Sequence, residues 1–401
     1  MSGVIEQRGH EGRHDIGKFP GTMEACVMKR CRTIVSNEIK DFHPAYFAMV
    51  MATGIVSIAF EGMAFPNIAR VLFALNLVLY LILCVVLAAR AWLFFPNLMA
   101  DLRTLQRAWL FLTVVVGTNT LATQLVMFQH ARDLAIILWF MALIGWVICL
   151  YFILSGFISL QKKPLYETVN GATLLIIVST VSVALLGFRL LDATAPYAGY
   201  AYLAAWMLWI SGFILYLFIV PLLIYRLFFR PFQLEDWRAP YWICMGAVAI
   251  ITWAGSEFVV YMPASAPWEG MREATLWMTL LAWTIGTCWI PYQLIMDIRN
   301  FISVDIAAST PLWIKVFPWS RLAFGRQHHF YDPSSWSRVF PMGMYTACTF
   351  ALAKATGFES LSIMAQCWGA FALLIWSLTF IGMLRAVMAL RSRCVETTPP
   401  A

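Results

Sequence analysis

Ten long stretches of the chain contain no Asp, Glu, Lys or Arg, and together they cover more than half of its 401 residues. Nine have 18 or more residues, and the ninth along the chain has 15. A helix rises ~1.5 Å per residue and a bilayer core is ~30 Å thick, so ~20 apolar residues span it. The pattern predicts an all-α integral membrane protein with ten transmembrane helices. They are 42–60, 71–89, 108–129, 134–161, 168–188, 193–225, 239–256, 274–296, 339–353 and 360–384.

The spans alternate in character along the chain. Odd-numbered spans contain 19 Ser, Thr, Asn and Gln in 95 residues, and even-numbered spans contain 16 in 128. Shorter and more polar helices are expected to line a wet interior, whereas longer apolar ones face lipid. We therefore expect an inner ring of odd-numbered helices surrounded by the even-numbered ones.

Composition supports one membrane domain with two short tails. Hydrophobic residues make up 61% of the chain and charged residues 12%, against ~25% charged in average soluble domains. We expect a disordered cytoplasmic tail at 1–41, a ten-helix domain at 42–390 and a cytoplasmic C-terminal tail at 391–401.

The distribution of positive charge indicates the orientation. The net charge is +7, and with the N-terminus inside, 23 of the 28 Lys and Arg fall in the tails and inner loops. This bias follows the positive-inside rule. It predicts a multi-pass protein of the cytoplasmic membrane with both termini inside, and nucleic-acid binding is not needed to explain the basic charge.

Metal and catalytic chemistry have weak support. His10-Glu11-Gly12-Arg13-His14 matches H-E-x-x-H, but it lies in a polar tail without a third ligand, and catalytic zinc needs three protein ligands. We predict no catalytic residue, no metal site and no cofactor. Glu257 near the outer end of span seven and His130 at the end of span three remain candidates for a proton relay.

Small and hydroxyl residues recur in the odd-numbered spans and suit an anion pathway, which gains from the absence of buried carboxylates. The glycines serve either close helix packing or a bend that exposes backbone N–H groups, and both uses stay open. The candidate pore-lining residues are Thr53, Gly54, Ser57, Thr118, Asn119, Gly171, Thr173, Gly246, Thr252, Gly343 and Thr346.

Two motifs carry a family resemblance. "HPAYFAMVMATGIVSIAF" opens span one and "WSRVFPMGMYTACTFALA" forms span nine. With ten spans, they resemble the tellurite-resistance/dicarboxylate transporter family, which includes tellurite-resistance protein A, yeast malate permease and plant slow anion channels. The resemblance implies five helical hairpins in quasi-five-fold arrangement around a central pore, assembled as a homotrimer. It also implies that Phe340, on the ninth span, occludes the pore.

Arg338 lies two residues before Phe340. It either adds positive potential at the inner mouth or extends its charge to the membrane interface. The resulting hypothesis is transport of small anions through a Phe-gated pore, the substrate being a C4-dicarboxylate such as malate, or sulfite, chloride or tellurite. The alternatives are a proton-coupled dicarboxylate carrier and a polytopic membrane enzyme or sensor.

Overall fold

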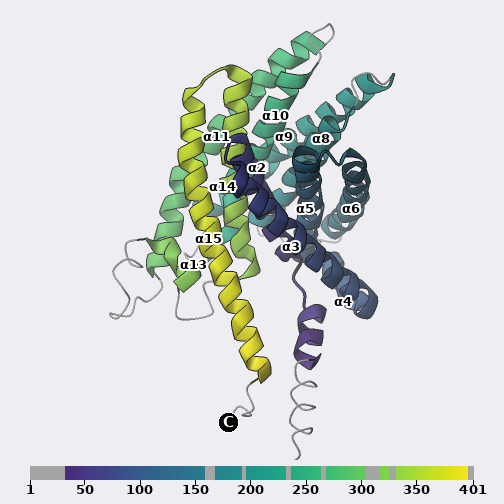
Figure 1. Cartoon of the computed structure of the whole chain (residues 1–401), viewed down its shortest axis with the longest axis vertical. Helices are drawn as coiled ribbons and strands as arrows, with labels where there is room; N and C mark the ends of the chain where they lie inside the picture. Colours follow the sequence, from purple (N-terminus) through teal and green to yellow (C-terminus); the bar gives the residue numbers. More distant parts are fainter. Residues whose placement is uncertain are drawn as a thin grey trace, which may run out of the picture.

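The chain folds into long helices that pack side by side (Figure 1). The computed structural model describes residues 32–158, 168–191, 196–231, 236–262, 268–303, 317–324 and 331–395. The long helices are α2 (Phe47–Gly62), α3 (Pro66–Leu93), α5 (Leu105–Gln129), α6 (Arg132–Ile158), α8 (Leu175–Arg189), α9 (Ala198–Phe229), α10 (Ile243–Tyr261), α11 (Trp268–Ser303), α14 (Trp336–Thr356) and α15 (Ser360–Val395). The short helices are α4 (Phe95–Arg103) and α13 (Arg321–Phe324). The described residues contain no strand, which confirms the all-α class.

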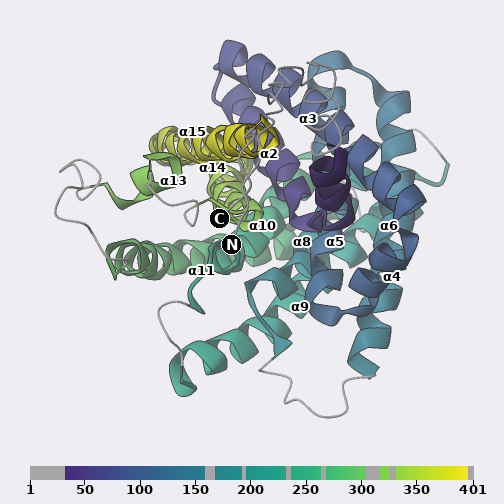
Figure 2. The ribbon, with the colours of Figure 1, turned by 90° about the horizontal axis from the view of Figure 1, so that it is seen from below.

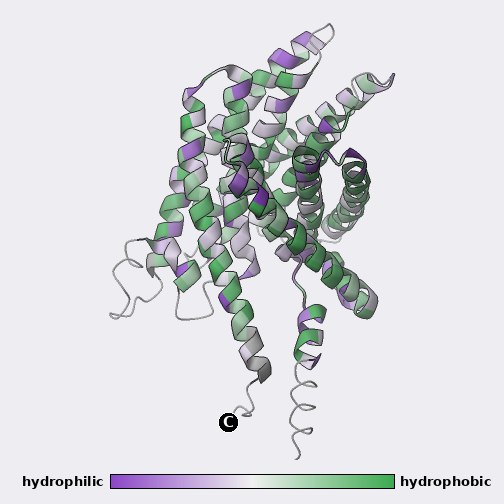
Figure 3. Cartoon of the chain, viewed as in Figure 1, coloured by the Kyte–Doolittle hydropathy of each residue, from purple (hydrophilic) through white to green (hydrophobic). Residues whose placement is uncertain are grey.

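Among the described residues, eight helical segments are long and apolar enough to cross a membrane. Hydrophobic colour runs along most of α6 and α15 in Figure 3. α11 and α14 contain the predicted spans 274–296 and 339–353, but their compositions are more polar than those of the eight. The membrane fold is therefore established, and the total of ten spans stays a prediction for these two helices.

Burial separates the helices into two sets. In the spans built on α2, α5, α8 and α10, 78–94% of the most apolar window is buried. In α3, α6, α9 and α15 only 17–33% is buried. Sixteen of the 21 residues of α14 are also buried. The predicted division into inner odd-numbered and outer even-numbered helices is confirmed for these elements.

The five inner helices pack in a closed cycle. α2 contacts α5, α5 contacts α8, α8 contacts α10, α10 contacts α14, and α14 returns to α2. Each also packs against the outer helix that follows it in the chain. Figure 2 shows α2, α5, α8, α10 and α14 near the middle of the bundle, with α3, α6, α9 and α11 further out. The quasi-five-fold symmetry of this ring remains a prediction.

The inner helices begin with tight turns that meet at one end of the ring. Four of the five are preceded by a 3-10 turn, namely η1 (Pro44–Tyr46), η2 (Gly171–Leu174), η4 (Ala239–Trp242) and η6 (Pro333–Ser335). η1 contacts η6, η6 contacts η4, and η4 contacts η2. Proline suits such starts because its missing N–H would have had no partner there. The N-terminal ends of the ring are thus gathered together.

The recurrence of small residues in the inner helices has a packing explanation. A Cβ added to Gly54 would lie 2.5 Å from Thr120 Cγ2, and one added to Gly343 would lie 2.9 Å from Ile55 Cγ2. At Gly246 the nearest atom would be Pro341 Cγ at 2.8 Å. Helices α2, α10 and α14 run unbroken through these positions. Of the two uses left open by the sequence, the structure supports close approach between neighbouring inner helices.

Candidate functional site

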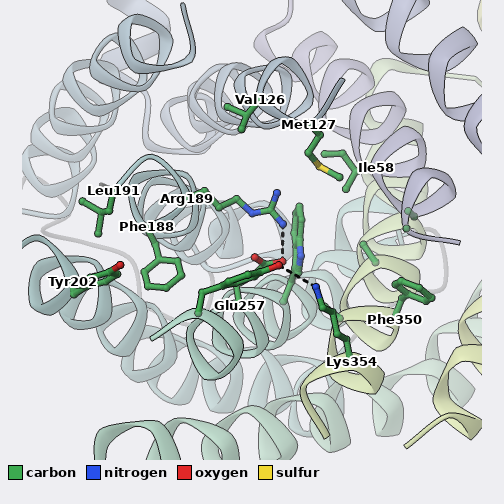
Figure 4. A pocket seen from close by; sticks show the side chains of 16 residues that line it. Ile58, Val126, Met127, Phe188, Arg189, Leu191, Tyr202, Glu257, Phe350 and Lys354 are labelled. Carbon is green, nitrogen blue, oxygen red and sulfur yellow. Dashed lines mark hydrogen bonds and ion pairs between the residues drawn. The ribbon is translucent and has the colours of Figure 1, made fainter. Parts of the chain in front are cut away.

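The C-terminal ends of all five inner helices line a pocket of about 600 Å³. Because each helix of the ring contributes to it, the pocket lies on the ring's interior. Figure 4 shows side chains from these helices converging on the cavity. Its lining comprises Ile58, Ala59, Gly62, Val126, Met127, Phe188, Arg189, Leu191, Tyr202, Trp253, Glu257, Tyr261, Ala347, Phe350, Ala351 and Lys354.

Two cations and one carboxylate meet in this pocket. Arg189 Nη2 donates to Glu257 Oε1 at 2.6 Å, and the Arg189 guanidinium lies 5.1 Å from the centroid of the Trp253 ring. Lys354 Nζ donates to the Tyr261 hydroxyl at 3.0 Å. The pocket therefore has a net charge of +1 with these three groups ionised. It contains the cations that an anion would meet on entering this end of the ring.

Phe340 occupies the helix face that leads to the pocket. It is buried, at 1% exposure. At ~100° per residue, Ala347, Ala351 and Lys354 all lie within ~40° of Phe340 around α14. Ala347, Ala351 and Lys354 line the pocket, so Phe340 is directed toward the same interior, about two turns deeper.

Arg338 is held away from the ring interior by a buried carboxylate. Its Nε donates to Asp297 Oδ2 at 2.5 Å, and the two side chains are 6% and 0% exposed. The same carboxylate accepts indole N–H groups from Trp237, Trp242 and Trp319 at 2.9–3.1 Å. The charge of Arg338 is thus balanced locally. The structure favours a role in fixing the start of α14 rather than the positive potential expected at the inner mouth.

Several hydroxyls expected to line a pore contact the outer helices. Thr53 Oγ1 accepts the indole N–H of Trp376 on α15 at 3.0 Å. Ser57 Oγ donates to the Ala69 carbonyl on α3 at 2.7 Å. Thr118 shares a hydrogen bond with the Tyr80 hydroxyl, also on α3. These groups join the inner ring to its surroundings, so we do not assign them to an anion path.

The remaining candidates differ in their surroundings. Thr173 belongs to the capping box of η2, and Gly171 packs against the backbone of η4. Thr252 and Thr346 donate to carbonyls of their own helices. Asn119 alone among the predicted polar residues bridges two inner helices.

Asn119 Nδ2 donates to Ser182 Oγ at 3.0 Å, which links α5 to α8. The Oδ1 atom of Asn119 is buried without a hydrogen-bond partner in the described structure. Ser182 was not among the predicted residues, and neither were Arg189 and Lys354. The sequence did contain a signal for Lys354. Ala347 and Lys354 lie seven and fourteen residues after Phe340, a spacing that returns to the same face of a helix.

Metal binding finds no support in the part of the chain that is described. Within it, no group of three or more His, Cys, Asp and Glu is arranged to hold a metal ion. The H-E-x-x-H motif at 10–14 lies outside the described residues.

The fold is that of a helical membrane protein with a charged pocket inside its buried ring. Residues 41–384 match the family model described as voltage-dependent anion channel. The chain therefore belongs to this family of anion transport proteins, and the match confirms the resemblance indicated by the motifs of spans one and nine.

Two relatives that match over most of their length agree with this assignment, and a third matches part of the chain. An uncharacterized transporter of Methanocaldococcus jannaschii is 24% identical over 360 residues, which cover 87% of this chain and 96% of that protein. A second uncharacterized transporter of the same organism is 24% identical and covers 90% of this chain and 95% of its own length. An uncharacterized membrane protein of Mycobacterium tuberculosis is 29% identical over 44% of this chain and 78% of its own length.

Proposed function

We propose that small anions cross the membrane through the interior of the five-helix ring and that Phe340 obstructs this path. The observation that carries the proposal is the pocket lined by all five inner helices, with Phe340 on the same face of α14 as Ala347 and Ala351. An apolar ring at a narrow point gates by excluding water, and movement of the ring opens the path.

Electrostatics support anions over cations. Both cations of the pocket, Arg189 and Lys354, lie at the C-terminal ends of inner helices, where they offset the negative end of the helix dipole. At the other end, the gathered N-termini of the inner helices present partial positive charge. Within the pocket, Glu257 is the one carboxylate, and it is paired with Arg189.

Location, assembly and substrate follow from the family and the charge pattern as parts of the same proposal. We place the protein in the cytoplasmic membrane with both termini inside, as a homotrimer, and we assign it no catalytic activity. The proposed substrates are small anions: a C4-dicarboxylate such as malate, or sulfite, chloride or tellurite. Phe340 and Asn119 are retained from the sequence as pathway residues. Arg338, expected from the sequence to act electrostatically at the inner mouth, is proposed instead as a positioning residue.

A proton-coupled carrier is the second candidate because Glu257 lies inside the pocket rather than in an exposed loop. His130, the other proton-relay candidate, is exposed at the end of α5 and does not line the pocket. In a carrier of this kind, a proton gradient directed into the cell would drive anion accumulation there. A channel would give a current whose reversal potential follows the anion gradient alone.

The proposal is tested by an anion-flux panel in proteoliposomes comparing the wild type with Phe340→Ala. We expect the variant to conduct at least roughly tenfold faster, the change that accompanies removal of ~1.4 kcal/mol from a barrier. Phe218→Ala is the matched control because Phe218 is 71% exposed on the outer helix α9. Flux through Phe340→Ala no higher than wild type would remove Phe340 from the gate.

A further inference from the structure

The charged pocket at the C-terminal end of the ring has the chemistry of a ligand site. We propose that it binds an organic anion with one carboxylate and a short apolar or aromatic body, and that Glu257 competes with this ligand for Arg189. The inference rests on the proposed function only in placing the pocket at one end of the anion path, and its ligand differs from the small anions proposed for transport. It concerns equilibrium binding, so it is measured separately from transport.

Arg189 supplies a guanidinium with unused capacity. A guanidinium has five N–H donors in a planar fork that matches a carboxylate. Glu257 accepts from Nη2, whereas Nε is buried and has no hydrogen-bond partner among the described residues. The guanidinium carbon lies 5.1 Å from the centroid of the Trp253 ring, within cation–π range. The resident carboxylate therefore uses only part of the fork.

Lys354 completes the cationic side of the pocket from another helix. Its ammonium contacts the Tyr261 hydroxyl and ring, and lies within electrostatic range of both Glu257 and Arg189. Figure 4 shows Arg189 and Lys354 directed toward Glu257 from different sides. With a net charge of +1, the three groups are neutralised by one monoanion. A dianion would introduce a second charge without a matching cation.

The walls favour an apolar body on the ligand. Phe188, Phe350, Ile58 and Met127 line the cavity together with Trp253. Small-molecule sites are commonly cavities of ~300–1,000 Å³ lined by apolar and aromatic residues with a few polar groups that fix orientation. About 600 Å³ places this pocket in that range. An inorganic anion would leave these walls without contact, whereas an aromatic carboxylate would use both parts of the site.

Glu257 acts as a tethered carboxylate in this arrangement. Its Oε1 already occupies a place at Arg189 that a ligand carboxylate needs. A free ligand must displace it or share the guanidinium with it, at the expense of repulsion between like charges. Removing the charge from Glu257 while keeping its shape should therefore strengthen ligand binding, whereas a purely structural ion pair would give no such gain.

The test is equilibrium binding of radiolabelled benzoate to the purified full-length chain in detergent. We expect Glu257→Gln to tighten binding roughly tenfold and Arg189→Gln to weaken it by at least roughly tenfold, the scale of a charge-assisted hydrogen bond. Lys354→Gln should weaken binding several-fold. Arg70→Gln is the matched control, since Arg70 is exposed at the start of α3 and does not line the pocket.

Competitors separate charge from shape. Unlabelled hexanoate should displace benzoate, benzyl alcohol should not, and malate and sulfate should do so only at higher concentration. If Arg189→Gln fails to fold, Lys354→Gln and Glu257→Gln still decide the matter. The inference is overturned if Glu257→Gln binds benzoate no more tightly than wild type, or if Lys354→Gln leaves binding unchanged. If benzoate binds but Phe340→Ala gives no anion flux, the proposed function is contradicted and this site stands. If Phe340→Ala gives anion flux but benzoate does not bind, this site is contradicted and the proposed function stands.

Discussion

Asp297 should be one of the most sensitive positions in the protein. Its carboxylate has no exposed surface and accepts five hydrogen bonds, two from Arg338 and one each from Trp237, Trp242 and Trp319. The carboxylate, on α11, is thereby joined to η4 and the residues just before it, to η5 (Pro318–Ser320) and to the start of α14. Asp297→Asn removes the charge and leaves the Arg338 guanidinium, 6% exposed, without a counter-ion.

The expected cost follows from that burial. Breaking a buried ion pair by removing one partner costs about 3–5 kcal/mol, because the remaining charge stays desolvated. Removing the second charge as well is less damaging, provided that the three indole N–H groups keep an acceptor. Asp297→Asn should therefore cost about 3–5 kcal/mol, and the double variant Asp297→Asn with Arg338→Met, which keeps an amide oxygen at 297, should recover at least half of that loss.

The assay is SDS titration of the purified protein in mixed micelles, which reports the free energy of unfolding of wild type, both single variants and the double variant. Asp133→Asn is the control, since Asp133 is exposed at the start of α6. Surface changes of that kind usually stay within ~0.5 kcal/mol. A loss below about 1 kcal/mol for Asp297→Asn, or a double variant that loses the sum of the single losses, would refute the reasoning.

Three smaller changes test other parts of the bundle by the same titration. Gly171→Ala should lower the free energy of unfolding by about 1–3 kcal/mol, because the new Cβ would lie 2.3 Å from a backbone carbonyl of η4. Gly270→Ala, with open space around the new Cβ, should leave it unchanged. Trp376→Phe should lose about 0.5–1.5 kcal/mol with its hydrogen bond to Thr53; an unchanged stability would mean that this contact contributes nothing. Burial lowers the pKa of His43 below its ordinary 6.5, so the folded state binds this proton less readily than the unfolded state. The contribution of neutral His43 to the free energy of unfolding is then full above pH ~6.5 and is lost as the pH falls through the lowered pKa. His43→Gln should flatten this dependence of the free energy of unfolding on pH.

The sequence determined the membrane fold and the sorting of helices because both depend on average composition. Long charge-free stretches identify spans, and the higher polar content of the odd-numbered stretches was enough to place α2, α5, α8 and α10 inside. α14 was the hardest to recognise as a span because Arg338 and Lys354 lie close to its ends. Their partners, Asp297 and Tyr261, come from other helices and were not evident from the local pattern.

The site was harder to predict because it depends on which way each side chain points. A threonine on an inner helix faces either the ring interior or the outer helices, and Thr53 is drawn outward by Trp376, 323 residues away. The pair Arg189 and Glu257 spans 68 residues and two helix ends. The motif of span nine was enough to identify Phe340, and helical periodicity then places Lys354 on the same face of α14.

The central claim is that anions pass through the ring interior, and cysteine block at Ala351 tests it most directly. Ala351 lines the pocket on the Phe340 face of α14. In a Phe340→Ala background, Ala351→Cys should lose most of its anion flux when a membrane-impermeant methanethiosulfonate is attached. The controls are Phe340→Ala with its native cysteines and Tyr200→Cys, at an exposed position in the first turn of α9, and both should keep their flux. Complete modification of Ala351→Cys with unchanged flux would contradict a path through the ring.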